Sequence, residues 1–295
     1  MEFEEQLIDS PDGRVIEVAT LGSPAASTVF FHHGTPGSSS MIRFLSPLTA
    51  GGALQLVTMS RPGYGRSSRR EGRDVAAVVE DVRTVLDALG RDSYVAAGWS
   101  GGGPHALACA ALDAPRCAGA WSLAGVTPFD ADIDWTEGMG PENLEEYALA
   151  QEGGPRYEAY IAEQVAQLAE ATADNVIEIF GGLLPDVDKA ALADDGARGL
   201  FADAIGRGFA NGGRGFLDDN RALQADWGFD PREIDVPVSI WYGDADLMVP
   251  PSHGAWLGTA LPTATSHFLP GEGHISLLTN RGSELRDDLI GRARP

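Results

Sequence analysis

A Gly-x-Ser-x-Gly pattern at residues 98–102, centred on Ser100, has the residue types and spacing of a nucleophilic site. It follows a short apolar run at residues 94–98 and precedes a helical pattern that starts near His105. A serine in such a tight strand-to-helix turn exposes its hydroxyl group, and the N–H groups of the following helix can stabilise an oxyanion. Because the pattern also occurs in plain glycine-rich turns, its meaning depends on partners elsewhere in the chain.

A second loop, residues 33–37 with the sequence His-Gly-Thr-Pro-Gly, follows the apolar run at residues 28–32. In hydrolases with a serine elbow, this loop supplies one N–H group of the oxyanion hole, and the residue after the nucleophile supplies the other. The two donors would be the backbone N–H groups of Thr35 and Gly101. We expect His33, Gly34 and Trp99 to support the site. Taken alone, the loop also fits an ordinary turn.

A nucleophilic serine needs a histidine as its base and a carboxylate that orients the base. Of the four histidines after Ser100, His274 is the one in a loop directly after an expected strand, whereas the others lie in helical or strand patterns. The carboxylate should follow the preceding strand, residues 236–242, where Asp244 and Asp246 are both candidates. We select Asp246, because it lies far enough beyond the strand to reach across. Asp244 remains the alternative, with a role in capping or bracing the loop.

The elements that would position these loops alternate between short apolar runs and helical patterns. Strands are expected at residues 3–8, 14–20, 28–32, 54–59, 94–98, 118–123, 236–242 and 265–269. Helices are expected at residues 75–89, 105–112 and 252–259, and from about residue 276 onward. Buried strands that alternate with helices are typical of an α/β protein with a mostly parallel sheet.

Residues 127–232 interrupt this alternation, because they show helical patterns and no convincing strand. Helices are expected there at residues 141–151, 155–171, 174–180, 197–209 and 214–227. We therefore divide the chain into an α/β core, residues 1–126 and 233–295, and an all-helical insertion, residues 127–232. The insertion should lie near the carboxyl ends of the strands, where α/β sheets bind ligands. Most hydrophobic side chains on the helix faces should simply pack within the insertion. Candidates among them for an apolar pocket wall are Trp135, Tyr147, Tyr157, Tyr160, Ile179, Phe180, Phe209 and Phe216.

The insertion contains 22 acidic and 7 basic residues, so it holds −15 of the net charge of −22. Acidic residues at this density are typical of a solvated helical surface. They would also create a field that favours neutral or cationic ligands over anionic ones. A strongly acidic chain is repelled by phosphates, so nucleic acid and anionic membranes are poor candidate partners.

The remaining composition predicts an ordinary soluble protein of the cytoplasm. Its 295 residues, 43% of them hydrophobic, can bury a sizeable core. The two cysteines, Cys109 and Cys117, are expected to be buried free thiols in a reducing compartment. We see no signal peptide and no apolar stretch of about 18 residues that would suggest a membrane span. No pattern predicts a metal site or a cofactor-binding loop, so we expect neither metal nor cofactor; the oligomeric state stays open.

Together these segments resemble the α/β-hydrolase superfamily, in its capped bacterial group of esterases, haloperoxidase-like enzymes and proline-iminopeptidase-like enzymes. The resemblance rests on residues 33–37, 61–67, 98–102, 227–229, 237–241, 243–246 and 271–274. It implies an α/β-hydrolase fold, with a mostly parallel eight-stranded sheet, helices on both faces, and an inserted helical cap over the active site. Ser100 in the nucleophile position, rather than aspartate, argues against haloalkane dehalogenases and epoxide hydrolases. The His-Gly-Thr-Pro-Gly loop differs from the peptidases' His-Gly-Gly-Pro-Gly, which argues against peptidase activity.

We therefore expect a serine hydrolase of a small-molecule acyl substrate, with Ser100, His274 and Asp246 as catalytic triad. A small to medium neutral carboxylic ester is the favoured substrate. Haloperoxidase-like or perhydrolase chemistry and the hydrolysis of amides, thioesters or carbon–carbon bonds stay open. A non-catalytic binding module is the alternative from another class, and it is disfavoured because a pure binder needs no complete triad.

Overall fold

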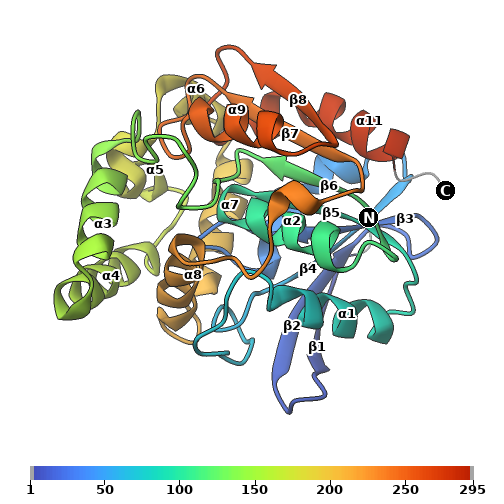
Figure 1. Cartoon of the computed structure of the whole chain (residues 1–295). Coiled ribbons are helices and arrows are strands. Elements are labelled where there is room, and N and C mark those ends of the chain that lie inside the picture. The colour runs from blue at the N-terminus through green and yellow to red at the C-terminus, as the bar shows by residue number, and fades with distance from the viewer. Residues whose placement is uncertain (1–2, 293–295) are drawn as a thin grey trace.

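The computed structural model describes residues 3–292, which form one eight-stranded sheet flanked by helices (Figure 1). The strands are β1 (Phe3–Asp9), β2 (Val15–Leu21), β3 (Ser27–His32), β4 (Leu54–Met59), β5 (Tyr94–Trp99), β6 (Cys117–Leu123), β7 (Val238–Gly243) and β8 (Ala264–Leu269). Their order in the sheet is β1-β2-β4-β3-β5-β6-β7-β8. The pairs β1–β2 and β2–β4 are antiparallel, and all other pairs are parallel. The predicted α/β-hydrolase fold with a mostly parallel eight-stranded sheet is therefore confirmed.

Alternate residues of the central strands pack on opposite faces of this sheet, as the two-residue repeat of a strand requires. Val29 and Phe31 of β3 belong to one hydrophobic cluster, whereas Phe30 between them belongs to the other. The first cluster includes side chains of α7 (Asp195–Gly208) and α11 (Gly282–Arg292). The second includes side chains of α1 (Val78–Ala88), α2 (Gly103–Leu112) and α9 (Pro251–Ala260). Helices thus cover both faces of the sheet, as predicted.

Helices occupy the chain between β6 and β7, which we call the helical segment. They are α3 (Pro141–Glu152), α4 (Gly154–Leu168), α5 (Val176–Phe180), α6 (Asp186–Ala191), α7 and α8 (Arg214–Gln224), with short 3₁₀ turns at Gly181–Leu183 and Pro231–Glu233. In Figure 1, the helices α3, α4 and α5, in green to yellow, lie to one side of the sheet. No described helix is both long enough and apolar enough to cross a membrane.

The structure differs from the sequence expectations about helices in two places. The short helix α6 was not predicted, because its six residues are too few to show a helical repeat. The single helix expected from about residue 276 is two helices, α10 (Ser276–Asn280) and α11. They are separated at Arg281, whose guanidinium binds Glu272 and Glu284.

Candidate active site

Ser100 lies in the sharp turn between β5 and α2, where its backbone has a φ of 56°. A positive φ is strained for a residue with a side chain, so the surroundings must hold it. Glycines on both sides make the turn possible. A Cβ atom at position 98 would lie 2.0 Å from the carbonyl oxygen of Gly102, and one at position 102 would lie 2.2 Å from that of His32. The glycines of the motif are therefore required by the close approach of backbone to backbone.

His274 and Asp246 lie in the loops after β8 and β7, where their side chains are buried and hydrogen-bonded to each other. The distance between His274 Nδ1 and Asp246 Oδ2 is 2.7 Å. Asp246 Oδ1 accepts two further hydrogen bonds, of 2.8 Å each, from the backbone N–H groups of Met248 and Val249. Since a carboxylate oxygen only accepts, Nδ1 of the ring carries a proton, and in the neutral imidazole Nε2 then has the lone pair. This tautomer has the nitrogen that can accept a proton from a hydroxyl group.

Asp244, the alternative acid, does not contact the His274 ring. Its exposed side chain accepts a hydrogen bond of 2.7 Å from the backbone N–H of Gly271. This bond links the loop after β7 to the loop after β8. The geometry therefore gives Asp244 the bracing position and places Asp246 beside the histidine.

Trp99 connects the Ser100 turn to the histidine loop. Its indole Nε1 donates a hydrogen bond of 3.0 Å to the carbonyl oxygen of His274, and the two rings lie with their centroids 4.9 Å apart. Gly34 lies against the Trp99 ring, because a Cβ atom at position 34 would lie 3.1 Å from the ring atom Cε3. Trp99 thus packs between the turn, the histidine loop and the loop after β3.

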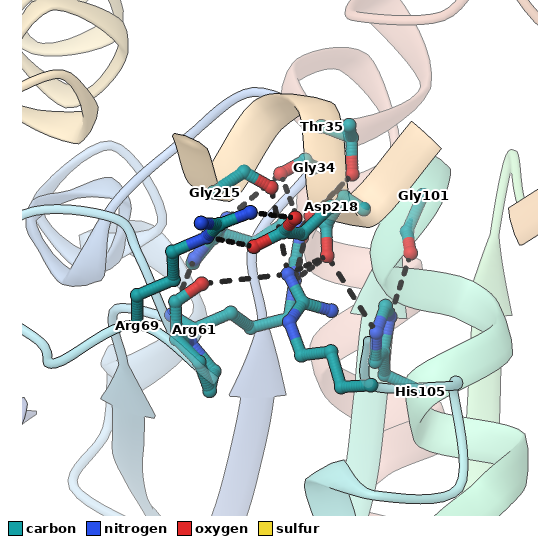
Figure 2. A network of polar contacts seen from close by, with 12 residues as sticks. Gly34, Thr35, Arg61, Arg69, Gly101, His105, Gly215 and Asp218 are labelled. Atoms are coloured by element: carbon teal, nitrogen blue, oxygen red, sulfur yellow. Dashed lines mark hydrogen bonds and ion pairs between the residues drawn. The ribbon is translucent and has the colours of Figure 1, made fainter. Parts of the chain in front are cut away.

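The loop after β3 brings Thr35 next to Gly101, the two expected oxyanion donors. A Cβ atom at Gly101 would lie 2.4 Å from Thr35 Oγ1. Arg61 holds this loop, because its guanidinium donates to the carbonyl oxygens of His33 and Gly34 and to Thr35 Oγ1 (Figure 2). The His33 ring accepts a hydrogen bond at Nε2 from the Arg61 backbone and therefore donates from Nδ1 to Gly34, at 2.7 Å. Both His33 and Gly34 thus support the position of Thr35.

Asp219 of α8 balances the charge of Arg61 inside the protein. Its carboxylate lies 2.6 Å from Arg61 Nη2, 2.5 Å from Arg73 Nη2 and 2.9 Å from Thr35 Oγ1. Burial alone would raise the pKa of Asp219, but the two guanidinium groups hold that pKa well below its usual value. The sequence analysis missed Asp219, because Asp218-Asp219 looks like any acidic helix surface and its partners lie far away in the chain. This cluster fastens the helical segment to the loop that carries Thr35.

Asp188 of α6 fixes the backbone of the histidine loop and was also missed by the sequence analysis. Its carboxylate accepts three hydrogen bonds of 2.8–2.9 Å from the backbone N–H groups of His274, Ile275 and Ser276. The contact is close, because a Cβ atom at Gly273 would lie 2.5 Å from Asp188 Oδ1. Burial raises the pKa of Asp188. The helical segment therefore reaches both the loop that carries Thr35 and the loop that carries His274.

A cavity of about 110 Å³ lies beside Ser100, Gly101 and Thr35. Its other lining residues are Pro36, Val126, Glu142, Asn143, Glu146, Tyr147, Tyr160, Gln164, Leu168, Ile179, Phe180, Leu183, Phe216, Asn220, Leu223, Met248 and Val249. Most of them belong to the helical segment. The lining contains neither lysine nor arginine, and the His274 ring is not part of it.

Five of the eight predicted wall residues line this cavity, namely Tyr147, Tyr160, Ile179, Phe180 and Phe216. The other three do not, which corrects the prediction for Trp135, Tyr157 and Phe209. They are buried within the two hydrophobic clusters. Trp135, for example, packs edge-on against Tyr147 and His253. Within residues 3–292, no three or more His, Cys, Asp or Glu side chains are arranged to hold a metal ion.

Comparison with known proteins places this geometry in a family. Residues 27–281 match the family described as alpha/beta hydrolase fold, and the chain belongs to that family. It is 26% identical over 259 residues to the pimeloyl-[acyl-carrier protein] methyl ester esterase of Neisseria meningitidis, with 87% of this chain and 89% of that protein covered. The match to epoxide hydrolase B of Mycobacterium tuberculosis is 36% identical but covers 90 residues, 30% of this chain and 25% of that protein. Among solved structures, the esterase RhEst1 from Rhodococcus sp. superposes with a TM-score of 0.67 at 23% identity, with 98% and 99% of the chains covered.

Proposed function

We propose that this alpha/beta hydrolase is a serine hydrolase that cleaves small to medium carboxylic esters. The observation that carries the proposal is the 2.7 Å hydrogen bond between Asp246 and His274. Ser100 lies in a strained elbow turn, and its neighbour Trp99 donates a hydrogen bond to the carbonyl oxygen of His274. Support also comes from the methyl ester esterase that is similar to the chain over most of its length.

In this mechanism Ser100 is the nucleophile. Its Oγ attacks the ester carbonyl carbon while His274 Nε2 takes the hydroxyl proton, and the carbonyl electrons move to the oxygen. The tetrahedral intermediate collapses, and the imidazolium gives its proton to the departing alkoxide. Water then attacks the acyl-enzyme with His274 as base again. The second tetrahedral intermediate breaks its bond to Ser100 Oγ, which takes its proton back from the imidazolium, and the carboxylic acid leaves. Asp246 holds the ring in the Nδ1–H tautomer and stabilises its positive charge in both halves.

The backbone N–H groups of Thr35 and Gly101 are the proposed oxyanion donors. Removing one such donor costs about 3 kcal/mol of transition-state stabilisation in serine hydrolases. Preorganisation matters for this effect, since the donors must already point at the place where charge develops. The hydrogen bonds of Arg61 and Asp219 to the Thr35 loop supply that rigidity.

We further propose that residues 127–232 act as a cap that sets substrate specificity, with residues 1–126 and 233–295 as the catalytic core. The cavity beside Ser100 is small and largely lined by this segment, which suits a compact substrate. Its lining lacks cations and includes two glutamates, so neutral esters should react faster than esters that carry a carboxylate. We place the enzyme in the cytoplasm, because its two cysteines are free and buried.

The same triad would serve perhydrolysis or the cleavage of amides, thioesters and carbon–carbon bonds, so the test compares these reactions directly. We would assay esters of graded acyl and alcohol size beside matched amides, thioesters and peracid formation, with Ser100→Ala as control. The proposal predicts that short esters give a higher kcat/KM than the matched amides and thioesters and that Ser100→Ala lowers kcat by about 10³-fold or more. Turnover of an amide or thioester well above every ester would contradict the ester assignment. Matched neutral and anionic esters, compared at low and high salt, test the charge preference.

A further inference from the structure

The buried acidic side chains of this protein have partners that compensate their charge, as burial of a carboxylate requires. Six of them face an arginine: Glu17, Asp81, Asp113, Asp218, Asp219 and Glu272. The other two, Asp188 and Asp246, accept backbone N–H groups, and Asp246 also binds the His274 ring. Buried carboxylates of this chain are thus stabilised either by an arginine or by backbone N–H donors.

Glu146 of α3 is half-buried and has neither kind of partner. It lines the cavity beside Ser100, and among residues 3–292 no arginine or lysine forms an ion pair with it. Its hydrogen bond comes from a neutral amide, since Asn220 Nδ2 donates to Glu146 Oε1 at 2.7 Å. Burial raises the pKa of Glu146 to about 7. When it is ionised, this carboxyl group is therefore a charge at the cavity wall without a cationic partner among the described residues.

Glu142, one turn earlier on α3, lines the same cavity and gives a second, independent observation. Its Oε1 accepts a hydrogen bond of 2.7 Å from the backbone N–H of Gly182. Its Oε2 is buried and has no hydrogen-bond partner among the described residues. A buried acceptor without a donor costs free energy, and a ligand with a donor would recover it.

The aromatic side chains of the cavity also favour a positively charged ligand. Tyr147, Tyr160 and Phe180 line it together with the two glutamates. Aromatic faces attract cations through their quadrupole, and carboxylates attract them directly. A cavity with both features and no cation of its own is complementary to a positively charged ligand group.

We propose that Glu146 is a specificity-determining residue that forms an ion pair with an ammonium group of the substrate. This inference rests on the proposed esterase function and narrows it to esters with an amino group on the acyl or the alcohol part. Glu142 supplies the second acceptor for the same ammonium group. Neutral esters of equal size remain substrates, but they leave the glutamate without its partner.

The test compares isosteric ester pairs that differ in charge. Methyl ω-aminoalkanoates of graded length would be assayed beside methyl alkanoates with a methyl group in place of the amino group. Aminoalkyl acetates and alkyl acetates form the second series. At pH 8, where Glu146 is mostly ionised, we expect the best amino ester to exceed its neutral partner in kcat/KM by about 10-fold or more. Because ionisation of the carboxyl group strengthens the pair, this ratio should rise between pH 6 and pH 8.

Glu146→Gln keeps an acceptor for Asn220 and removes the charge. It should bring the amino-to-neutral ratio of kcat/KM close to 1, because the amino ester loses its ion-pair partner. Glu145→Gln is the matched control, because Glu145 is an exposed neighbour on the same helix. If Glu145→Gln lowers the ratio as much as Glu146→Gln, the preference comes from the overall charge of the segment and the proposed ion pair is wrong.

A binding measurement separates this inference from the proposed function. Calorimetry would compare hexylammonium chloride with 1-hexanol on wild type and on Glu146→Gln, with no reaction involved. We expect the ammonium ion to bind wild type about 10-fold or more tightly than the alcohol, and Glu146→Gln to lose that difference. Equal binding of both compounds to wild type would overturn the ion pair, whether or not esters are hydrolysed. Preferential ammonium binding without any Ser100-dependent hydrolysis would contradict only the esterase assignment.

Discussion

Asp188 Oδ2 accepts a hydrogen bond of 2.9 Å from the backbone N–H of His274, across 86 positions of sequence. Asp188 lies on α6 of the helical segment, whereas His274 follows the last strand of the sheet. The carboxylate touches the backbone and not the ring, so it acts on the position of the histidine loop. We therefore regard Asp188 as a positioning residue for the proposed base.

Replacing Asp188 by asparagine should impair catalysis through His274. The amide keeps one acceptor but turns an NH₂ group toward backbone N–H donors, so at least one hydrogen bond is lost. We expect kcat to fall by about 10-fold or more with little change in KM, because substrate binding does not use this contact. Steady-state kinetics measure this split. Asp186→Asn, an exposed position on the same helix, should behave like wild type, and an equal loss in both variants would contradict the positioning role.

Replacing Asp246 should affect catalysis far more than replacing Asp244. Asp246→Asn should lower kcat by several orders of magnitude, because the imidazole loses the carboxylate that holds its tautomer. Asp244→Asn should have a small effect, since Asp244 braces Gly271 at the surface. Parallel kinetics of the two variants on one ester decide between them. A larger loss for Asp244→Asn would show that the hydrogen bond between Asp246 and His274 is not the functional one.

Asp219→Asn should destabilise the protein strongly. It leaves the buried guanidinium groups of Arg61 and Arg73 without their counter-charge, and breaking such buried pairs costs about 3–5 kcal/mol. The pKa of Asp219 lies below its unfolded value, so its stabilising effect is complete above about pH 4 and is lost as the pH falls further. Urea unfolding at pH 7 and at acid pH should show the difference between wild type and variant shrinking with acid. A constant difference would mean that ionisation of Asp219 is not what stabilises the cluster.

Glu146 should give stability the opposite pH dependence. Its pKa is raised from 4.5 to about 7, so the folded protein holds this proton more tightly than the unfolded chain does. Stability is therefore lost as the pH rises from about 4.5 to 7. Glu146→Gln removes that loss. We therefore expect the free energy of unfolding of the variant, relative to that of wild type, to rise by about 1–2 kcal/mol when the pH is raised from 5 to 8. Denaturant unfolding at both pH values measures this gain, and a gain equal at both would argue against titration of Glu146.

The core of the fold was predictable because its signals are local. The apolar run before Ser100 and the helical pattern after it are contiguous, and their order indicates a strand, a sharp turn and a helix. The loops with Asp246 and His274 could be found in the same way, since each directly follows an expected strand. Even so, Asp244 and Asp246 could not be separated by local signals, because both lie in the same loop.

The residues that join the helical segment to the site could not be predicted. Asp188 lies on a helix too short for a periodic pattern, and Asp219 differs from a solvated acid only through Arg61 and Arg73, which are more than 140 positions away. Glu146 lies among other acidic residues of α3, where composition predicts a surface. What distinguishes these carboxylates is their partners and, for Asp188 and Asp219, their burial, and both depend on how distant helices pack.

Covalent labelling of Ser100 tests the central claim most directly. A fluorophosphonate reacts with an activated serine, and the mass of the intact protein reports how many molecules are attached. The account predicts one label per chain, located by peptide mapping on Ser100, with loss of ester hydrolysis in step with labelling. Ser100→Ala and His274→Ala should label at least about 100-fold more slowly, because the nucleophile or its base is missing. A label on another residue, or full labelling of Ser100→Ala, would contradict the assignment of Ser100 as the nucleophile.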